Sequence, residues 1–259
     1  MVYQVYPRAF ADGNGDGVGD LRGLIERLDH LAGSPYSLGV DALWLTPFYP
    51  SGGVDAGYDV ADYTAVGPAW TYDEATGQWY LHSFSPQQPD LDWDNPDVRA
   101  AMHDVMRFWL GRGVDGLRID VAQCLGKDPA LGDNPWPVTK PTAESAGGHH
   151  EDRESVFERL GEIRAVADEH PDRMLVGEVY VLEQGRLAQY AAPGRLHLAH
   201  NFTFERQEWS AEGFRAVVDG FEAAAPEGTW PAASFRAGAR RPLPGRRRCA
   251  GTSGCARAC

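Results

Sequence analysis

Short apolar runs alternate with amphipathic stretches along this chain. Apolar residues at helical spacing predict helices over residues 20–32, 96–110, 153–168 and 212–224. Short apolar runs of the kind found in buried strands cover residues 2–6, 40–45, 115–120, 173–178 and 196–204. Strands that alternate with amphipathic helices favour parallel βα units, so the pattern indicates an α/β protein.

Two of the predicted strands end in charged residues. Side chains alternate along a strand, so Leu117 and Ile119 should face one side and Arg118 and Asp120 the other. The run that begins at Met174 also stops on a carboxylate, Glu178. Catalytic residues of barrel enzymes lie at the carboxyl ends of strands, and two carboxylates are the minimum for cleaving a glycosidic bond.

The first of these carboxylates also has a plain structural interpretation. Asp120 could cap a helix or simply pair with Arg118. As a nucleophile it would have its pKa lowered by the nearby cation. Glu178 would need a raised pKa to donate a proton to a leaving oxygen.

The alternation of strands and helices is interrupted over residues 47–95. These residues show neither apolar positions at helical spacing nor a clear apolar run of the strand type. A structureless stretch this long is unusual inside a compact domain. Only five or six barrel-type strands can be counted, whereas a closed barrel needs eight. We therefore expect an incomplete TIM (β/α)8 barrel that lacks a unit between residues 45 and 96.

Oxygen-bearing side chains alternate with glycines in the loop at residues 12–20. This spacing lets a tight loop wrap one hard cation, and it predicts a calcium site. The expected ligands are Asp12, Asn14, Asp16, the carbonyl of Val18, and Asp20. The alternative is a polar turn in which the aspartate at position 20 caps the next helix.

Two further segments combine carboxylates with aromatic rings, as sugar sites do. They run over residues 55–63 and 88–93, and either could equally be an ordinary loop. Cys124 is interpreted as a buried small residue, and His149 with His150 as solvated surface.

The charge of the chain argues against a nucleic-acid partner. The 259 residues carry a net charge of −13, whereas phosphate binding needs a basic face. Residues 232–259 differ, with seven arginines, no acidic residue and three of the four cysteines. One cysteine in the remainder suits a reducing compartment, and no apolar run reaches membrane-spanning length. We expect a cytoplasmic protein without a signal peptide that acts on a small saccharide.

Together these segments resemble the alpha-amylase family of glycoside hydrolases, in particular its alpha-glucosidase and oligo-1,6-glucosidase branch. The resemblance extends from Val2 to about Pro231 with one large gap. It rests on six segments in the right order, at residues 3–10, 12–20, 57–63, 88–93, 116–120 and 177–179.

The resemblance implies a calcium-bearing TIM barrel with a subdomain inserted after the third strand, and a retaining exo-glucosidase. Asp120 matches the family's nucleophile, Glu178 its general acid and base, and Arg118 the arginine that orients the nucleophile. Matches to residues that contact the substrate are Asp55 and Tyr58, which hold the terminal glucose, and Gln88, which lines the pocket. Val121, directly after the nucleophile, favours alpha-1,6 over alpha-1,4 bonds.

The sequence departs from the family at two places. No Asn-His pair occurs between Val66 and Trp93, where the family's third strand should end. The His-Asp pair expected after the seventh strand, which carries the third carboxylate, is replaced by residues 232–259. This end is interpreted as a changed reading frame or a chimera, or alternatively as a natural basic tail.

These departures define the expected organisation. Residues 1–66 would hold the first barrel units and residues 67–95 a remnant of the inserted subdomain. Residues 96–231 would hold the catalytic strands, and residues 232–259 the basic tail. An open barrel without its third carboxylate should be impaired or inactive. A trehalose synthase-like transferase, a non-catalytic sugar- or calcium-binding remnant, and a product without function remain as alternatives.

Overall fold

The computed structural model describes seven stretches of the chain. They are residues 1–53, 55, 58–60, 83–84, 88–129, 151–207 and 210–233. Residues 61–82, most of the predicted subdomain remnant, lie outside this part, as do His149, His150 and residues 234–259.

Helices and strands alternate through the described residues as the sequence pattern predicts. The strands are β1 (Val2–Val5), β2 (Ala42–Leu45), β3 (Gly116–Ile119), β4 (Met174–Gly177), β5 (Leu198–Asn201) and β6 (Trp230–Ala233). The helices are α1 (Pro7–Phe10), α2 (Leu21–Glu26), α3 (Leu28–Leu31), α4 (Pro96–Leu110), the short 3-10 helix η1 (Ala122–Leu125), α5 (Ser155–Ala167), α6 (Gln184–Tyr190), α7 (Phe202–Glu205) and α8 (Ala211–Ala224).

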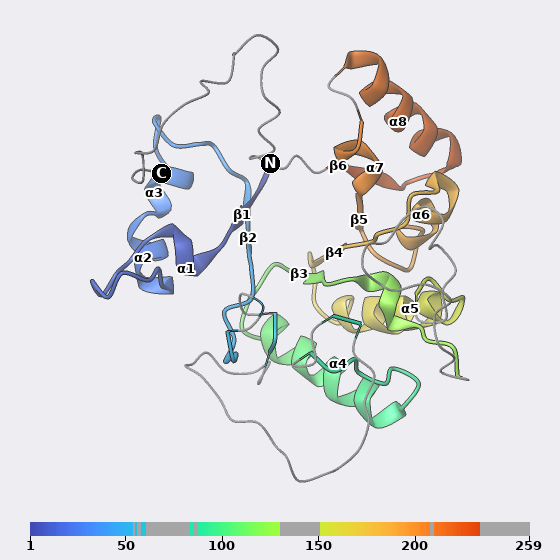
Figure 1. Cartoon of the computed structure of the whole chain (residues 1–259), viewed down its shortest axis with the longest axis horizontal. Helices are drawn as coiled ribbons and strands as arrows, with labels where there is room; N and C mark the ends of the chain where they lie inside the picture. Colours follow the sequence, from blue (N-terminus) through green and yellow to red (C-terminus); the bar gives the residue numbers. More distant parts are fainter. Residues whose placement is uncertain are drawn as a thin grey trace, which may run out of the picture.

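All pairs within the named strands are parallel. One two-stranded sheet joins β1 to β2, and a four-stranded sheet has the order β3-β4-β5-β6. Figure 1 shows β1 and β2 with α1–α3 on one side of the molecule, and the four-stranded sheet with the later helices on the other. The predicted α/β class with parallel strands is therefore confirmed.

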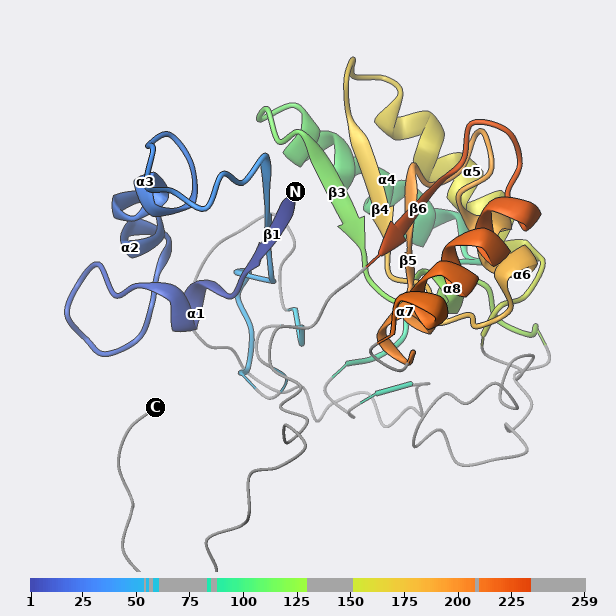
Figure 2. The same ribbon diagram turned by 90° about the horizontal axis from the view of Figure 1, so that it is seen from above.

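The four-stranded sheet buries one face against helices. Leu175 of β4 and Ala199 of β5 are fully buried, in one core with residues of α4, α5, α6 and α8. Leu117 and Ile119 of β3 pack against this same core. Arg118 therefore lies on the opposite face, as the alternation predicts. Figure 2 shows these helices gathered on one side of the sheet.

The first two strands have a smaller core of their own. Val5, Leu24, Leu31 and Val40 are buried together, and α2 and α3 cover the strand pair. Gly23 of α2 lies so close to the backbone of Ala11 that an added Cβ would approach its carbonyl oxygen to 2.1 Å. This contact needs glycine, and it fixes α2 against the loop at residues 12–20.

Some boundaries differ from the prediction. The helix predicted over residues 20–32 breaks at Arg27 into α2 and α3. The strand predicted over residues 196–204 ends at Asn201, because the Asn201 side chain accepts a hydrogen bond from the Thr203 N–H and starts α7. Strand β6 reaches Ala233, two residues into the predicted tail, because its backbone continues to pair with β5.

No helix among the described residues is long and apolar enough to cross a membrane. The four sequence-based domain boundaries remain a prediction.

Candidate active site

One arginine holds both predicted catalytic carboxylates. Nη1 of Arg118 donates to Oδ1 of Asp120, and Nη2 forms an ion pair with Oε2 of Glu178. The arginine side chain is 13% exposed, the aspartate 46% and the glutamate 24%. A mostly buried guanidinium with a fixed fork therefore pairs with two more accessible carboxylates at once.

Strand register brings these three side chains to one place. Ile119 pairs with Gly177, so Asp120 and Glu178 each follow the last paired residue of neighbouring parallel strands. The ladder continues beyond the strands, since the Glu178 N–H donates to the Ile119 carbonyl at 2.8 Å. Two residues that are 58 positions apart in sequence thus end adjacent strands at the same sheet edge.

The arginine remains cationic at neutral pH. Burial lowers the pKa of Arg118 to about 10, and interaction with Tyr58 opposes that shift. Its positive charge therefore lies against the two negative carboxylates with which it pairs.

Two aromatic side chains that the sequence did not single out complete this face. The Arg118 guanidinium lies 4.8 Å from the ring centroid of Trp44 on β2, and the Trp44 ring lies 5.5 Å from that of His200 on β5. Burial, and then the charge of Arg118, lower the pKa of His200 to about 4, so this imidazole is neutral at pH 7. In the sequence, Trp44 lies in an apolar run typical of a core strand. Its place beside the two carboxylates is evident only from its contacts with Arg118 and His200.

The loop at residues 51–60 places Tyr58 beside the arginine. The buried carboxylate of Asp59 accepts hydrogen bonds from the Ser51 hydroxyl at 2.7 Å and the Asp55 N–H at 3.3 Å. The Arg118 guanidinium then lies 5.8 Å from the Tyr58 ring centroid. Asp55 accepts a hydrogen bond from Nε2 of Gln88 at 3.0 Å. The structure thus groups the three predicted sugar-binding residues, whose roles remain predictions.

Other residues of the 88–93 segment are structural. The Asp90 carboxylate pairs with Nζ of Lys127 at 2.6 Å and accepts a hydrogen bond from the Ser83 N–H at 2.9 Å. Trp93 is buried in the main core. Within residues 88–93, Gln88 therefore remains the candidate for contact with a sugar. Burial raises the pKa of the Cys124 thiol to about 12, which agrees with its interpretation as a non-nucleophilic residue.

The predicted metal loop is closed by its own backbone. Asp12 accepts hydrogen bonds from the N–H groups of Gly15 and Gly17 at 2.6 and 2.7 Å, and these groups hold its pKa below the usual value. Asn14 accepts the Asp16 N–H, and Asp16 accepts the Val18 N–H. The side-chain oxygens predicted to bind calcium therefore accept hydrogen bonds from the backbone of the same loop, and these bonds order it.

Asp20 has the helix-capping role that the sequence left as an alternative. Its Oδ1 accepts the Gly23 N–H at 2.6 Å at the start of α2. Within the described residues, no group of three or more His, Cys, Asp or Glu side chains is arranged to hold a metal ion.

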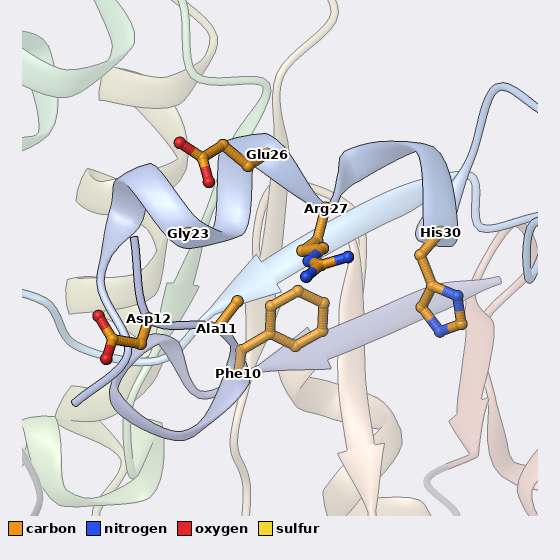
Figure 3. Close-up of a pocket in the computed structure, with 7 residues that line it drawn as sticks. All are labelled: Phe10, Ala11, Asp12, Gly23, Glu26, Arg27 and His30. Atoms are coloured by element: carbon orange, nitrogen blue, oxygen red, sulfur yellow. The ribbon is translucent and has the colours of Figure 1, made fainter. Parts of the chain in front are cut away.

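A separate hollow of about 520 Å³ opens beside this loop. Its lining residues are Phe10, Ala11, Asp12, Gly23, Glu26, Arg27 and His30. Figure 3 shows the Phe10 ring beneath Arg27, with Asp12 at the loop end of the hollow. Neither predicted catalytic carboxylate lines it, so the hollow is not the site built around Arg118.

A parallel α/β fold with two carboxylates at the ends of neighbouring strands is typical of a class of enzymes that hydrolyse glycosidic bonds or transfer sugars. The catalytic-domain model of alpha amylase matches residues 4–69 and 66–217. The chain therefore belongs to the alpha-amylase family, whose barrel fold agrees with the parallel strands described above.

Relatives and solved structures agree with this assignment. The chain is 32% identical to an oligo-1,6-glucosidase of Parageobacillus thermoglucosidasius, over 80% of this chain and 49% of the relative. It is similar to the crystal structure of an alpha-glucosyl transfer enzyme, with a TM-score of 0.77 and 30% identity over 90% of this chain and 59% of that one. The isomaltulose synthase of Protaminobacter rubrum gives a TM-score of 0.72 at 27% identity, over 89% of this chain and 56% of that one. The chain thus spans about half the length of the curated relatives it matches.

Proposed function

We propose that this chain derives from a retaining exo-alpha-glucosidase, with Asp120 as nucleophile and Glu178 as general acid and base. The observation that carries the proposal is the Arg118 fork, which holds both carboxylates at the ends of β3 and β4. Paired carboxylates are the equipment of a two-step displacement at a sugar carbon.

In the first step, an Asp120 oxygen attacks C1 of the terminal glucose while the bond from C1 to the glycosidic oxygen breaks. Glu178 gives its proton to that oxygen, and the remaining saccharide leaves as an alcohol. In the second step, the Glu178 carboxylate takes a proton from water, and the water oxygen attacks C1. The bond from C1 to Asp120 breaks, and glucose leaves with its original configuration.

The exo mode rests on the group of Asp55, Tyr58 and Gln88. A carboxylate and an amide can accept and donate hydrogen bonds to the hydroxyls of one terminal ring, and an aromatic ring can pack on its face. The oligo-1,6-glucosidase name of the relative supports alpha-1,6 bonds over alpha-1,4, in agreement with the prediction from Val121.

Transfer to a sugar acceptor is the second candidate function. The solved structures described above include a glucosyl transfer enzyme and an isomaltulose synthase. Transfer would use the same first step, with a sugar hydroxyl replacing water in the second. New disaccharides among the products would identify transfer, and glucose alone would identify hydrolysis.

We also propose that the barrel of this chain is incomplete and that turnover is reduced or lost. The alignment with the oligo-1,6-glucosidase extends over 282 residues, more than the 259 residues of the chain, so the relative has residues inside the aligned region that this chain lacks. The two segments matched by the family model meet at residues 66–69, where the sequence predicts a lost strand and a remnant of the inserted subdomain. Residues 234–259, which come after β6, contain no Asp or Glu.

The test is release of glucose from isomaltose and maltose by the purified chain. We expect slow release that Asp120→Asn and Glu178→Gln abolish, with isomaltose preferred. Asp219→Asn, an exposed residue of α8, is the matched control and should leave the rate unchanged. Release that persists in both carboxylate variants would refute the assigned roles. Calorimetric binding of isomaltose without any turnover would instead favour a non-catalytic sugar-binding remnant.

Calcium binding at residues 12–20 is a separate proposal. The donors Asp12, Asn14, Asp16 and the Val18 carbonyl are hard oxygens that suit calcium, and the carboxylate of Asp20 has one oxygen besides the one that caps α2. An ion bound there would stabilise the loop against α2 and take no part in bond breaking. Millimolar calcium should raise the melting temperature, and Asp16→Asn should remove the increase. An equal increase with magnesium would point to a nonspecific effect.

We also propose a cytoplasmic location for this chain and a small saccharide as its partner. One cysteine among the first 231 residues suits a reducing compartment, and the strongly negative net charge argues against a nucleic-acid partner.

A further inference from the structure

The loops that follow Asp120 and Glu178 are joined beyond the ends of their strands. The Ala122 N–H donates to the Glu178 carbonyl at 2.7 Å, which continues the ladder past the catalytic positions. One residue further along the first loop and two residues further along the second, a glutamine side chain replaces the backbone as partner. The Gln123 Oε1 accepts the Tyr180 N–H at 3.2 Å.

Gln123 is well placed for this role. Its residue is 3% exposed, which makes it one of the few buried polar residues in the described part of the chain. Its backbone carbonyl accepts the Asp152 N–H at 2.8 Å, so it also fixes the segment that leads into α5. A buried amide with defined partners on two sides holds a single arrangement of the loops it joins.

The backbone between Asp120 and Gln123 gives a reason why such a connection is needed. Val121 has φ 35° and ψ 52°, a left-handed conformation that a β-branched residue rarely adopts. Strain of this kind persists only where the surroundings hold it. The hydrogen bonds from Ala122 and to Gln123 help to hold the turn directly after the nucleophile, together with the one that the Cys124 N–H donates to the Val121 carbonyl at 2.8 Å.

We propose that Gln123 is a positioning residue that sets the separation of Asp120 and Glu178 by pairing with the backbone of the Glu178 loop. Its contribution to chemistry rests on the proposed glucosidase function, whereas its contribution to loop geometry does not. Gln123 acts through the two carboxylates and contacts no substrate itself.

The test compares Gln123→Met, which removes the acceptor at similar volume, with Gln123→Glu, which keeps an acceptor oxygen. The matched control is Gln184→Met, because Gln184 donates to the Leu182 carbonyl and the Thr203 hydroxyl at the start of α6 and not between the two catalytic loops. The probe is an alpha-configured cyclophellitol epoxide. Asp120 opens the epoxide to form an ester, and Glu178 donates the proton that turns the epoxide oxygen into a hydroxyl.

We expect roughly 100-fold slower labelling of Asp120 in Gln123→Met, the loss typical of a misplacement of about 1 Å. Gln123→Glu should recover most of the rate, and Gln184→Met should label within about twofold of the wild type. The pH profile of labelling should also change in Gln123→Met, because the proton donor no longer has the same surroundings. Labelling of Gln123→Met at the control rate would overturn the proposal.

Amide hydrogen exchange separates this proposal from the glucosidase proposal. We expect faster exchange at Ala122, Glu178 and Tyr180 in Gln123→Met and no change there in Gln184→Met. Unchanged exchange in Gln123→Met overturns the positioning role whether or not the probe reacts. A wild type that the probe does not label, together with faster exchange in Gln123→Met, overturns the catalytic roles assigned to Asp120 and Glu178 in this chain and still supports the positioning of the loops.

Discussion

The guanidinium of Arg118 lies 4.8 Å from the ring centroid of Trp44, and this contact joins the two separate sheets of the molecule. Arg118 belongs to β3 and Trp44 to β2, strands that share no backbone hydrogen bond. The same arginine pairs with both carboxylates. The electrostatic centre of the site is therefore also a point where the first unit meets the second.

We predict that Trp44→Leu lowers the free energy of unfolding by about 2 kcal/mol, from the loss of a partly buried ring over a cation. Trp44→Phe keeps an aromatic face and should lose about half as much. Urea unfolding followed by circular dichroism measures both. Equal losses in the two variants would show that the cation–π contact contributes nothing.

The buried pair of Asp90 and Lys127 should be sensitive to removal of one partner. The two side chains are 13% and 9% exposed, with 2.6 Å between Oδ2 and Nζ. We expect Lys127→Met to cost about 3 kcal/mol, because it leaves a buried carboxylate without its cation. Adding Asp90→Asn should recover part of this loss in chemical denaturation. No recovery in the double variant would contradict the pairing as the cause.

Protonation of His200 should make stability fall in mild acid. Its folded pKa of about 4 is below the ordinary value near 6.5, because burial and Arg118 disfavour the charged ring. Between these two pKa values the imidazole binds a proton in the unfolded chain but not in the folded chain. The free energy of unfolding therefore decreases as the pH falls from about 6.5 to about 4. The loss amounts to about 3 kcal/mol.

Urea unfolding at pH 7 and pH 4.5 measures this dependence. His200→Phe should flatten it, whereas His30→Gln, at an exposed position, should keep the wild-type dependence. The same acid sensitivity in His200→Phe would assign the effect to other groups.

Relief of backbone strain at Val121 is predicted to be stabilising. Glycine adopts the φ of 35° without the clash of a β-branched side chain, so Val121→Gly should raise the free energy of unfolding by about 1 kcal/mol. Val121→Ala should gain less, because alanine still carries a Cβ. A loss in Val121→Gly, read from the urea midpoint, would mean that the valine side chain contributes more through packing than the turn costs in strain.

Local patterns predicted the elements well where periodicity is strong. Helix α4 was predicted with its true bounds, because Asn95 caps it and Pro96 occupies the first turn. Helix α6 was missed, since its apolar residues fill less than two turns. The break at Arg27 was also missed, because an unbroken apolar stripe continues through it.

The sequence by itself determined which residues could do chemistry. Arg118, Asp120 and Glu178 were identifiable because each ends or nearly ends an apolar run, and strand alternation fixed which of them share a face. The helix cap at Asp20 was likewise readable as an alternative, since capping depends on neighbours three residues away.

Only the tertiary structure decided how these residues combine. That Arg118 contacts both carboxylates follows from the register of β3 against β4, which depends on packing of residues far apart in sequence. Trp44 and His200 gained their places by contact between elements, and Gln123 gained its place by burial. The type of a residue in the sequence carries no such information. Local hydrogen bonds fix caps and turns, whereas only the folded core brings distant strand ends to one edge and assembles the site.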